Sequence, residues 1–520
     1  MNKVVDIDNV PSEILNIPAQ KLRLAERGEL HDEKFETKPI GYFRDAWIRF
    51  RKNRSSVVAA MIILAIILFA LIVPLISPYD VSFSVTTYSK KLPRTKLLSK
   101  IGIFDGTKVR ERNDNAYAYT VGIGVGAADT DGTGATWEEG LAHELSPAKR
   151  IIREYEREGK RYRDIAIDVY LEVGFRYYSV TDEEYEKIRA WENETGIQVL
   201  YPMVDTHSEF CYDPLDANYW YKTKPGRMEP IKETDFSYRE IDIDTEQLEP
   251  NYLYDKDGNV RFYQNIGTNM KKIRVLYYNY YRYLYGFEPY HLFGTDASGY
   301  DICVRLADGV RLSIMLAVFV SAINFVIGGV YGAIEGYFGG TADLIMERIA
   351  DILYNMPFMV VVTLFQLHFA NKVGPIMSLL FAFVTTGWIG TASRIRMQFY
   401  RFKNSEYVYA ARTLGASDAR LMLRHIFPNS LGTIITSSVM VIPGVIYSET
   451  MLSFLGIISL QGDKGTSLGT MISNAQASLT QFPHMMFFPA LIISLLMISF
   501  NLFGNGLRDA FNPSLRGVED

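Results

Sequence analysis

The chain has 520 residues, more than a single domain normally holds, so at least two structural units are expected. Hydrophobic residues make up 48% of it, yet the mean hydropathy is only +0.01, because very apolar segments are averaged with a large polar block. The net charge of −5 excludes a typical basic nucleic-acid-binding domain, and two cysteines are too few for a disulfide framework. Cys211 and Cys303 are expected to be free thiols, with one bridge between them as the alternative. Seven histidines without ligand spacing predict no metal site.

The first 54 residues are expected to form a cytoplasmic tail. Residues 1–40 are polar and contain three prolines, and five basic residues follow between Arg44 and Arg54. The next run, Val57 to Ile76, is apolar and long enough to cross a bilayer core, which takes about 20 helical residues. Because basic residues collect on the cytoplasmic side, residues 55–77 are predicted to be a transmembrane helix that leaves the N-terminus inside.

Residues 78–292 contain no apolar run long enough to span a bilayer, so this block is predicted to be external. Its aromatic content favours a folded α+β domain inserted between the first and second transmembrane helices. The expected elements are a helix opened by Ser146 and Pro147 and ended by Gly159, a strand at Ile165–Val173, a helix from the capping box of Thr181 and Glu184 to Trp191, and a hairpin turn at Asp257 and Gly258.

A group of tyrosines crowds the return to the membrane. Tyrosine is enriched where a bilayer meets water, so an interfacial belt is predicted, and a peptide-binding surface is the alternative. The residues are Tyr277, Tyr278, Tyr280, Tyr281, Tyr283 and Tyr285.

Residues 293–520 are predicted to be an all-α membrane unit. With the first span, five further apolar segments make about six transmembrane helices: Leu312–Ile334, Ile349–Ala370, Ile376–Thr391, Leu431–Leu455 and Met486–Phe503. Because each crossing changes sides, residues 336–347, residues 394–428 and the C-terminus are predicted to be cytoplasmic, and residues 371–375 and 459–484 external. The positive-inside rule agrees, since residues 394–428 contain Arg394, Arg396, Arg401, Lys403, Arg412, Arg420 and Arg424.

The stretch Glu406–Asn429 lies between two apolar segments without being one itself. Ser405 can cap a first short helix, which Gly415 would end. Asp418 can cap a second helix, which Pro428 would end before the next span. We therefore predict two short helices joined at a glycine and held at the membrane surface, where a partner protein can grip them. A connector that only rests on lipid headgroups is the alternative.

The residues of this stretch follow the order Tyr409, Ala410, Ala411, then Gly415, then His425, Ile426, Phe427 and Pro428. This order resembles the coupling-helix motif of binding-protein-dependent ABC transporter permeases, although that family usually has Glu at Tyr409 and Leu at Phe427. The resemblance implies that residues 406–428 insert into a groove of a cytoplasmic ATPase subunit. It assigns ATPase coupling to Glu406, Tyr409, Ala410, Ala411, Gly415, Ala416, Ser417, Asp418, His425 and Pro428.

A second group of residues precedes the second predicted span: Gly294, Thr295, Asp296, Gly299, Asp301, Arg305, Leu306, Gly309, Arg311 and Ser313. It resembles the C-type subunit of oligopeptide, dipeptide and nickel permeases, with Tyr300 where that subunit has Arg. Arg305 and Arg311 are expected near the headgroups, on an external segment turned by Gly299. The same family is matched by Glu449, Leu452, Ser453, Phe454, Leu455 and Gly456, and by Gly504, Gly506, Leu507, Arg508, Asp509, Asn512, Pro513 and Leu515. The resemblance does not cover residues 78–292.

Two ionisable residues are expected within the spans, where charge is costly. Asp351 is expected to pair with Arg348 or to be hydrated. For Glu449 two roles stay open, lining the translocation path or hydrogen bonding to a neighbouring helix. Pro357 and Pro443 are expected to interrupt their spans, either around a cavity or for packing.

The resemblance implies a permease subunit of an ATP-driven importer that works by alternating access, with oligopeptides or dipeptides favoured over nickel chelates or another small solute. It implies a second homologous permease subunit, two cytoplasmic ATPase subunits and an external substrate-binding protein as partners in the bilayer, and no nucleic acid. The chain has no Walker A motif, so ATP and Mg are expected in the ATPase subunits, with no cofactor and no catalytic residue here. The external domain is expected to dock the binding protein. An ATP-independent channel or sensor is the alternative from another class.

Overall fold

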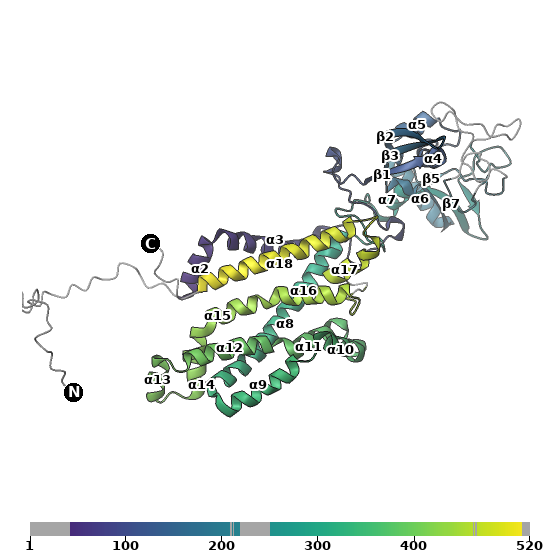
Figure 1. Cartoon of the computed structure of the whole chain (residues 1–520). Coiled ribbons are helices and arrows are strands. Elements are labelled where there is room, and N and C mark those ends of the chain that lie inside the picture. Colours follow the sequence, from purple (N-terminus) through teal and green to yellow (C-terminus); the bar gives the residue numbers. More distant parts are fainter. Residues whose placement is uncertain are drawn as a thin grey trace, which may run out of the picture.

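The computed structural model describes residues 42–208, 211, 213–218, 250–460, 462 and 465–511. A bundle of long helices occupies one part of the molecule and a mixed part with helices and strands the other (Figure 1). The mixed part, called the intervening region here, comprises residues 77–301 between helices α3 and α8. The predictions for residues 1–41 and for Asn512, Pro513 and Leu515 lie outside the described residues.

The bundle contains the predicted apolar spans. In the described part of the chain, five helical segments are long and apolar enough to cross a bilayer, and a bent helix pair is a sixth candidate. The five are α3 (Arg54–Ile76), α8 (Ile302–Phe338), α11 with α12 (Pro375–Gly387 and Ile389–Phe402), α14 to α16 (Asp418–Arg420, the turn Leu421–Ile426, Phe427–Val439 and Val441–Phe454), and α18 (His484–Phe511).

The sixth candidate differs from the straight span expected at Ile349–Ala370. Helices α9 (Gly340–Tyr354) and α10 (Phe358–Val373) meet at an angle of 73°. Pro357 is the N-cap residue of α10, and the break lies there because proline cannot continue the hydrogen bonding of a helix. The predicted connection at residues 336–347 is also helical, with a kink at Gly339 (φ +66°) between α8 and α9.

Two further helices lie where connections were expected. Helix α2 (Tyr42–Lys52) belongs to the predicted N-terminal tail and packs on the end of α18. Its Phe50 ring meets Phe503 of α18 edge-on at 5.4 Å, which explains why this part of the tail is ordered as a helix. Helix α17 (Leu468–Ala475) lies in the predicted connection at residues 459–484, capped by Ser467.

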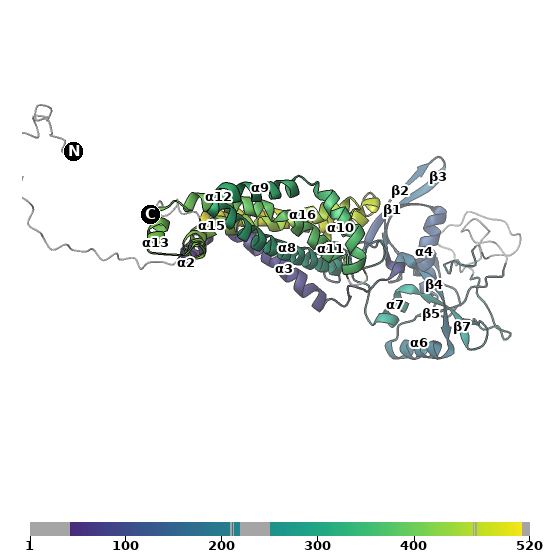
Figure 2. The same ribbon diagram turned by 90° about the horizontal axis from the view of Figure 1, so that it is seen from below.

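The described residues of the intervening region form two antiparallel sheets and four α-helices, and Figure 2 shows them beyond one end of the bundle. The first sheet has the order β1-β3-β2, and the second has β4-β7-β5 with β6 paired to β7. The strands are β1 (Thr107–Asn113), β2 (Ala148–Arg157), β3 (Lys160–Asp168), β4 (Phe175–Thr181), β5 (Leu200–Tyr201), β6 (Tyr263–Asn265) and β7 (Met270–Leu276). The helices are α4 (Asp114–Ala128), α5 (Trp137–Ala142), α6 (Asp182–Thr195) and α7 (Tyr277–Tyr285).

In this region, the predictions based on the Thr181 helix cap and on the turn at Asp257 and Gly258 are confirmed. Thr181 caps α6 by accepting a hydrogen bond from Glu184 N, and the helix runs past Trp191 to Thr195. The predicted turn at Asp257 and Gly258 forms, with Asp255 and Asn259 joined by a backbone bond of 2.8 Å. Both cysteines are free.

The helix predicted at residues 146–159 is wrong, because this stretch is strand β2. The strand pairs with β3, and Arg157 faces Lys160 across a two-residue turn. Both turn residues have positive φ, +55° at Glu158 and +72° at Gly159, as the tight primed turns of hairpins require. Pairing with β3 therefore overrides the helix-start signal of Ser146 and Pro147.

The predicted interfacial tyrosine belt is wrong for four of its six residues. Tyr277, Tyr278, Tyr280 and Tyr281 lie on α7 and are buried in the core of the intervening region. Their rings pack around Tyr88, whose centroid is 5.0 Å from that of Tyr277 and 5.3 Å from that of Tyr281. These four tyrosines therefore pack in the protein interior and do not face lipid.

Candidate functional site

The elbow, defined as residues 405–428, begins with helix α13 (Glu406–Thr413). Ser405 occupies the N-cap position with an extended backbone, but its side chain makes no capping bond. Gly415 ends the helix as predicted. Its N–H donates to Arg412 O at 3.0 Å, and Ala416 N–H donates to Ala411 O at 3.1 Å, which is the Schellman arrangement. Gly415 has φ +84° and open space around it, so the backbone angle alone requires glycine.

The second arm of the elbow differs from the prediction. Ser417 rather than Asp418 is the N-cap residue of α14. The short helix continues through a π-helical turn, Leu421–Ile426, directly into α15. Pro428 therefore does not end a helix; it lies in the first turn of α15, where the wider turn before it accommodates the missing N–H. This arm is continuous with the candidate span Asp418–Phe454, so a force on the elbow acts on that span.

Apolar contacts fasten the elbow to the bundle. Val408, Leu421 and Ile426 are completely buried. They form one cluster with side chains of α8, α12 and α15: Tyr337, Ile395, Phe399 and Ile434. Removing three such side chains from water contributes several kcal/mol at about 1.5–3 kcal/mol each, enough to hold the elbow as a rigid extension of these helices.

A polar contact joins the two arms to the end of α8. Tyr337 Oη donates to Asp418 Oδ1 at 2.5 Å, and Arg412 Nη2 donates to Tyr337 Oη at 3.3 Å. The contact with Tyr337 raises the pKa of the Arg412 guanidinium, so Arg412 stays charged. Tyr337 thus bridges α13 and α14, and sequence reasoning did not identify it.

The opposite side of the elbow is open. Leu414 is 88% exposed, Leu423 70% and Tyr409 47%, an unusual share of large apolar groups for a polar segment. Figure 1 shows the elbow at the end of the bundle farthest from the intervening region. Of the residues assigned to coupling, Glu406, Tyr409, Ala410, Gly415, Ser417, Asp418 and Pro428 are exposed, and Ala411, Ala416 and His425 are half-buried.

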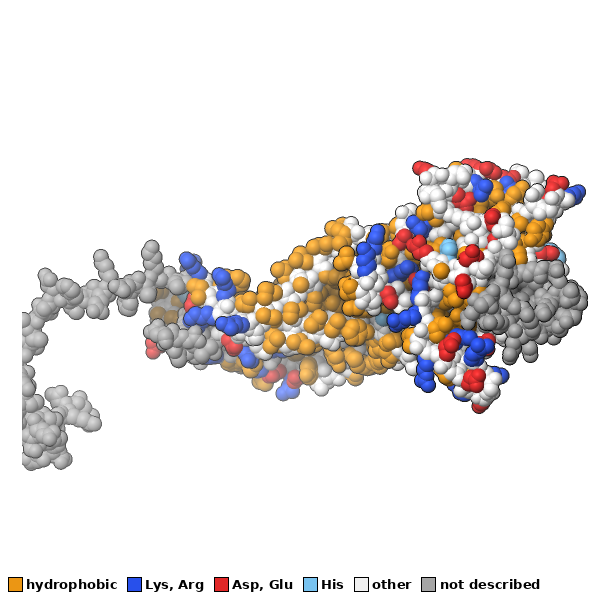
Figure 3. Space-filling model, turned by 90° about the horizontal axis from the view of Figure 1, so that it is seen from above, with side chains coloured by type: hydrophobic (Ala, Val, Ile, Leu, Met, Phe, Trp, Pro, Cys, Tyr) orange, Lys and Arg blue, Asp and Glu red, His pale blue; other side chains and the backbone are white. Residues whose placement is uncertain are grey.

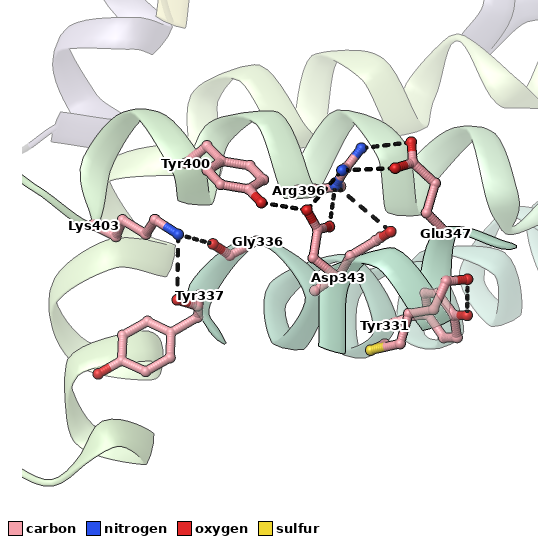
Figure 4. A network of polar contacts seen from close by, with 10 residues as sticks. Tyr331, Gly336, Tyr337, Asp343, Glu347, Arg396, Tyr400 and Lys403 are labelled. Carbon is pink, nitrogen blue, oxygen red and sulfur yellow. Dashed lines mark hydrogen bonds and ion pairs between the residues drawn. The ribbon is translucent and has the colours of Figure 1, made fainter. Parts of the chain in front are cut away.

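An ion-pair cluster lies beside the elbow (Figure 4). Arg396 of α12 bonds Asp343 of α9 through Nε (2.6 Å) and Nη2 (2.9 Å), and Glu347 through Nη1 (2.8 Å) and Nη2 (2.9 Å). Tyr400 donates to Asp343, and Lys403 Nζ donates to Gly336 O at 3.0 Å. We call Arg396, Asp343, Glu347 and Glu335 the Arg396 cluster. It ties α8, α9 and α12 together.

Three carboxylates of this cluster are close enough to bind a metal ion, since oxygens of Glu335, Asp343 and Glu347 lie within 4.8 Å of one another. The Arg396 guanidinium reaches all three, with Glu335 at 3.6 Å. A cation therefore already occupies the position between them, and the residues fit an arginine cluster rather than a metal site. In the sequence, this cluster is indicated only by acidic residues at 335–347 and basic residues at 394–403. The sequence does not show which of them form ion pairs.

The two ionisable residues expected within the spans lie in different surroundings. Asp351 pairs with Arg348 at 3.1 Å, as predicted, and its side chain is 48% exposed. Glu449 is fully buried and accepts hydrogen bonds from Ser453 Oγ (3.1 Å) and from Ser313 Oγ of α8 (3.3 Å). Glu449 therefore links two neighbouring helices.

A cavity of about 620 Å³ opens within the bundle. It is bordered by helices α8 to α12, α15, α16 and α18, and its lining mixes apolar groups with Asn324, Arg394, Ser448, Asn505 and Arg508. The break between α15 and α16 lies at Met440, one turn before Pro443, and Gly444 lines the cavity. The broken span thus bends around a hollow, one of the two alternatives for these proline interruptions.

The segment before α8 differs from expectation in one respect. Gly299 turns the chain with φ +84°, as predicted. The Arg305 side chain is enclosed by protein, because it is only 3% exposed. Its guanidinium lies 3.6 Å from the centroid of the Tyr300 ring and donates to Gly462 O at 3.2 Å. The Tyr300 ring therefore covers a buried arginine.

Comparison with known proteins identifies the family. The family described as binding-protein-dependent transport system inner membrane component matches residues 325–517, and the N-terminal TM domain of oligopeptide transport permease C matches residues 41–93. Residues 94–324 lie outside both matches.

Two curated relatives agree with this assignment. The oligopeptide transport system permease protein OppC of Bacillus subtilis is 41% identical over 228 residues, 44% of this chain and 72% of that protein. The dipeptide transport system permease protein DppC of the same organism is 39% identical over 227 residues, 44% of this chain and 69% of that protein. A solved structure of the MetNI methionine ABC transporter in inward-facing conformations covers 40% of this chain and 96% of its own, at 15% identity and a TM-score of 0.33. The chain belongs to the binding-protein-dependent transport system inner membrane components, the permease subunits of ABC transporters.

Proposed function

We propose that this chain forms half of the translocation path of an ATP-driven importer for oligopeptides or dipeptides. Two relatives, 41% and 39% identical to this chain over the aligned residues, are named as an oligopeptide and a dipeptide transport permease. The cavity of about 620 Å³ within the bundle supports this, because a second, homologous permease subunit could complete a path along it. Uptake of labelled dipeptides and longer peptides into liposomes tests this. Competition by nickel chelates but not by peptides would favour the alternative solute.

The elbow is the proposed contact with the ATPase subunits. Three features of the elbow support this contact. The elbow is anchored on α8 and α12, its opposite side exposes apolar residues, and its second arm is continuous with a candidate span. ATP and Mg would bind in the two ATPase subunits. Closure of those subunits would push the elbow and swing the attached span, which opens the path alternately to either side.

Replacing the most exposed apolar residue of the elbow should disrupt this contact. Leu414→Asp places a charge in the proposed groove without altering the bundle, because Leu414 is 88% exposed. We expect the ATPase subunits to be lost when the tagged transporter is purified in mild detergent and its components are identified by mass spectrometry. Leu215→Asp is the control, since Leu215 is 87% exposed but lies in the intervening region. Equal recovery of ATPases with both variants would contradict the proposal. Wild-type chain that purifies alone and conducts without ATP would favour a channel or sensor.

The proposed orientation places the elbow, α2 and both termini in the cytoplasm. Basic side chains gather at the α2 end of the bundle (Figure 3), and positive charge favours the cytoplasmic side. The intervening region then lies outside the cell, over the opposite end of the bundle, where it would meet an external substrate-binding protein.

Docking of that binding protein can be tested by removing the two sheets. Replacing residues 107–276 with a flexible linker keeps the segments that pack on the bundle, which contain Phe104 and Phe293. We expect uptake at limiting substrate to fall while basal ATP hydrolysis of the complex persists. A photo-cross-linker at Ile152, 49% exposed on β2, should capture the binding protein in the intact chain. Unchanged uptake together with no cross-link would remove this role.

A further inference from the structure

We propose that residues 95–104, between the first candidate span and strand β1, form a loop that inserts into the lipid headgroup layer beside the bundle. The inference depends on the spans crossing a bilayer, as the family requires. It does not depend on the substrate or on the ATPase contact. We call these residues the interfacial loop.

The interfacial loop is closed at its base by backbone bonds. Thr95 N–H donates to Phe104 O at 2.9 Å, and Gly106 N–H donates to Pro93 O at 3.1 Å. Its tip is a single 3-10 turn, Ser99–Ile101, that Gly102 ends with φ +75°. The loop is therefore a preformed projection, and little chain entropy is lost when it binds a surface.

The tip presents large apolar side chains that have no place in the protein interior. Leu97 is 82% exposed, Ile101 68% and Ile103 52%. Leaving such side chains in water is unfavourable, so three in seven residues indicate a surface that is covered. Lys96 and Lys100 alternate with them and are exposed too. Apolar groups flanked by lysines are typical of segments that lie in the headgroup layer.

The base of the loop fixes its height along the bundle. Phe104 has a left-handed backbone, φ +52°, which is rare outside glycine. This conformation places its ring 6.3 Å from that of Phe488, one turn into α18, within the apolar core of the bundle. Just beyond the loop, Lys108 Nζ donates to Gln481 O at 3.2 Å, directly before α18 begins. The loop is therefore level with the first turn of α18, where the span leaves the bilayer.

The loop also continues the outer surface of the bundle. Next to Phe488, the side chains of Phe487 (59% exposed) and Leu491 (42% exposed) face outward on α18. In Figure 1 the loop is the dark segment that projects sideways near the start of α18, and Figure 3 shows basic side chains along the edge of the apolar band. Lysines at the edge of a lipid-facing band match phosphate groups, so lipid is the occupant that fits.

Spin-label accessibility in liposomes of phosphatidylethanolamine and phosphatidylglycerol tests this. Full-length chain with its co-purifying subunits would carry Cys211→Ser and Cys303→Ala and one label, at Leu97→Cys or Ile101→Cys. Controls are Leu68→Cys, 44% exposed within α3, and Ile152→Cys, 49% exposed on β2. We expect the ratio of oxygen to nickel-chelate collisions at Leu97 and Ile101 to exceed that at Ile152 several-fold and to approach that at Leu68.

A second variant shows whether the apolar tip causes the insertion. With the label at Ile103→Cys, adding Leu97→Glu should lower the collision ratio toward that of Ile152, whereas adding Ile152→Glu should not. Labels at Leu97 and Ile101 that collide with the nickel chelate as often as Ile152 would overturn the proposal. So would labels shielded from both reagents, because a protein partner would then cover the loop.

Discussion

Replacing Gly332 by valine should unfold or misassemble the bundle, with a loss of about 3 kcal/mol or more from overpacking. A Cβ at Gly332 would lie 2.2 Å from Ala392 O of α12. One turn away on either side, a Cβ added at Gly328 would lie 2.6 Å from Trp388 O, and one added at Gly336 would lie 2.7 Å from Arg396 O. Glycines at this spacing let two helix backbones meet closely, as is common in membranes. The measurement is thermal unfolding of purified protein in detergent, together with uptake in liposomes.

Gly329→Val is the matched control for this experiment. It makes the same change one residue along α8, but the nearest atom to its Cβ is Ile395 Cδ1 at 3.9 Å. We expect Gly329→Val to lose only the small free energy that a β-branched residue costs in a helix. Equal losses in both variants would show that helix flexibility rather than contact with α12 is what the glycines provide.

Arg396→Gln should destabilise the end of the bundle beside the elbow by about 3 kcal/mol, because it leaves buried carboxylates without a counter-charge. Asp343 and Glu335 are only 7% and 3% exposed. Arg396→Lys should rescue little, since an ammonium cannot make the two-pronged bonds to Asp343 and Glu347. Thermal unfolding in detergent measures the loss, and ATPase stimulation by substrate reports whether the elbow still moves with the bundle.

Two further variants separate the Arg396 cluster from ordinary surface charge. Arg348→Gln removes an exposed pair with Asp351, and we expect a change below about 1 kcal/mol. Adding Asp343→Asn to Arg396→Gln should recover part of the loss, because one uncompensated carboxylate disappears. If Arg348→Gln cost as much as Arg396→Gln, the burial of the cluster would have no energetic role.

Features that depend only on a short stretch of the chain could be predicted from the sequence. The spans depend on the length of an apolar run, so α3, α8 and α18 lie where expected. The turn at Gly415 depends on one backbone angle that only glycine adopts freely, and it forms. The motif around it resembled the permease family, and the comparison with known proteins confirmed that family.

Features that depend on distant partners were decided by the tertiary structure. Residues 148–157 form strand β2 because they pair with β3. The tyrosines of α7 are part of the core because Tyr88 packs among them. Pro428 stays inside a continuous helix because a π turn precedes it. The Arg396 cluster and the position of the interfacial loop beside Phe488 likewise join residues far apart in the chain. Such pairings are set by packing between elements, which no local pattern of residues records.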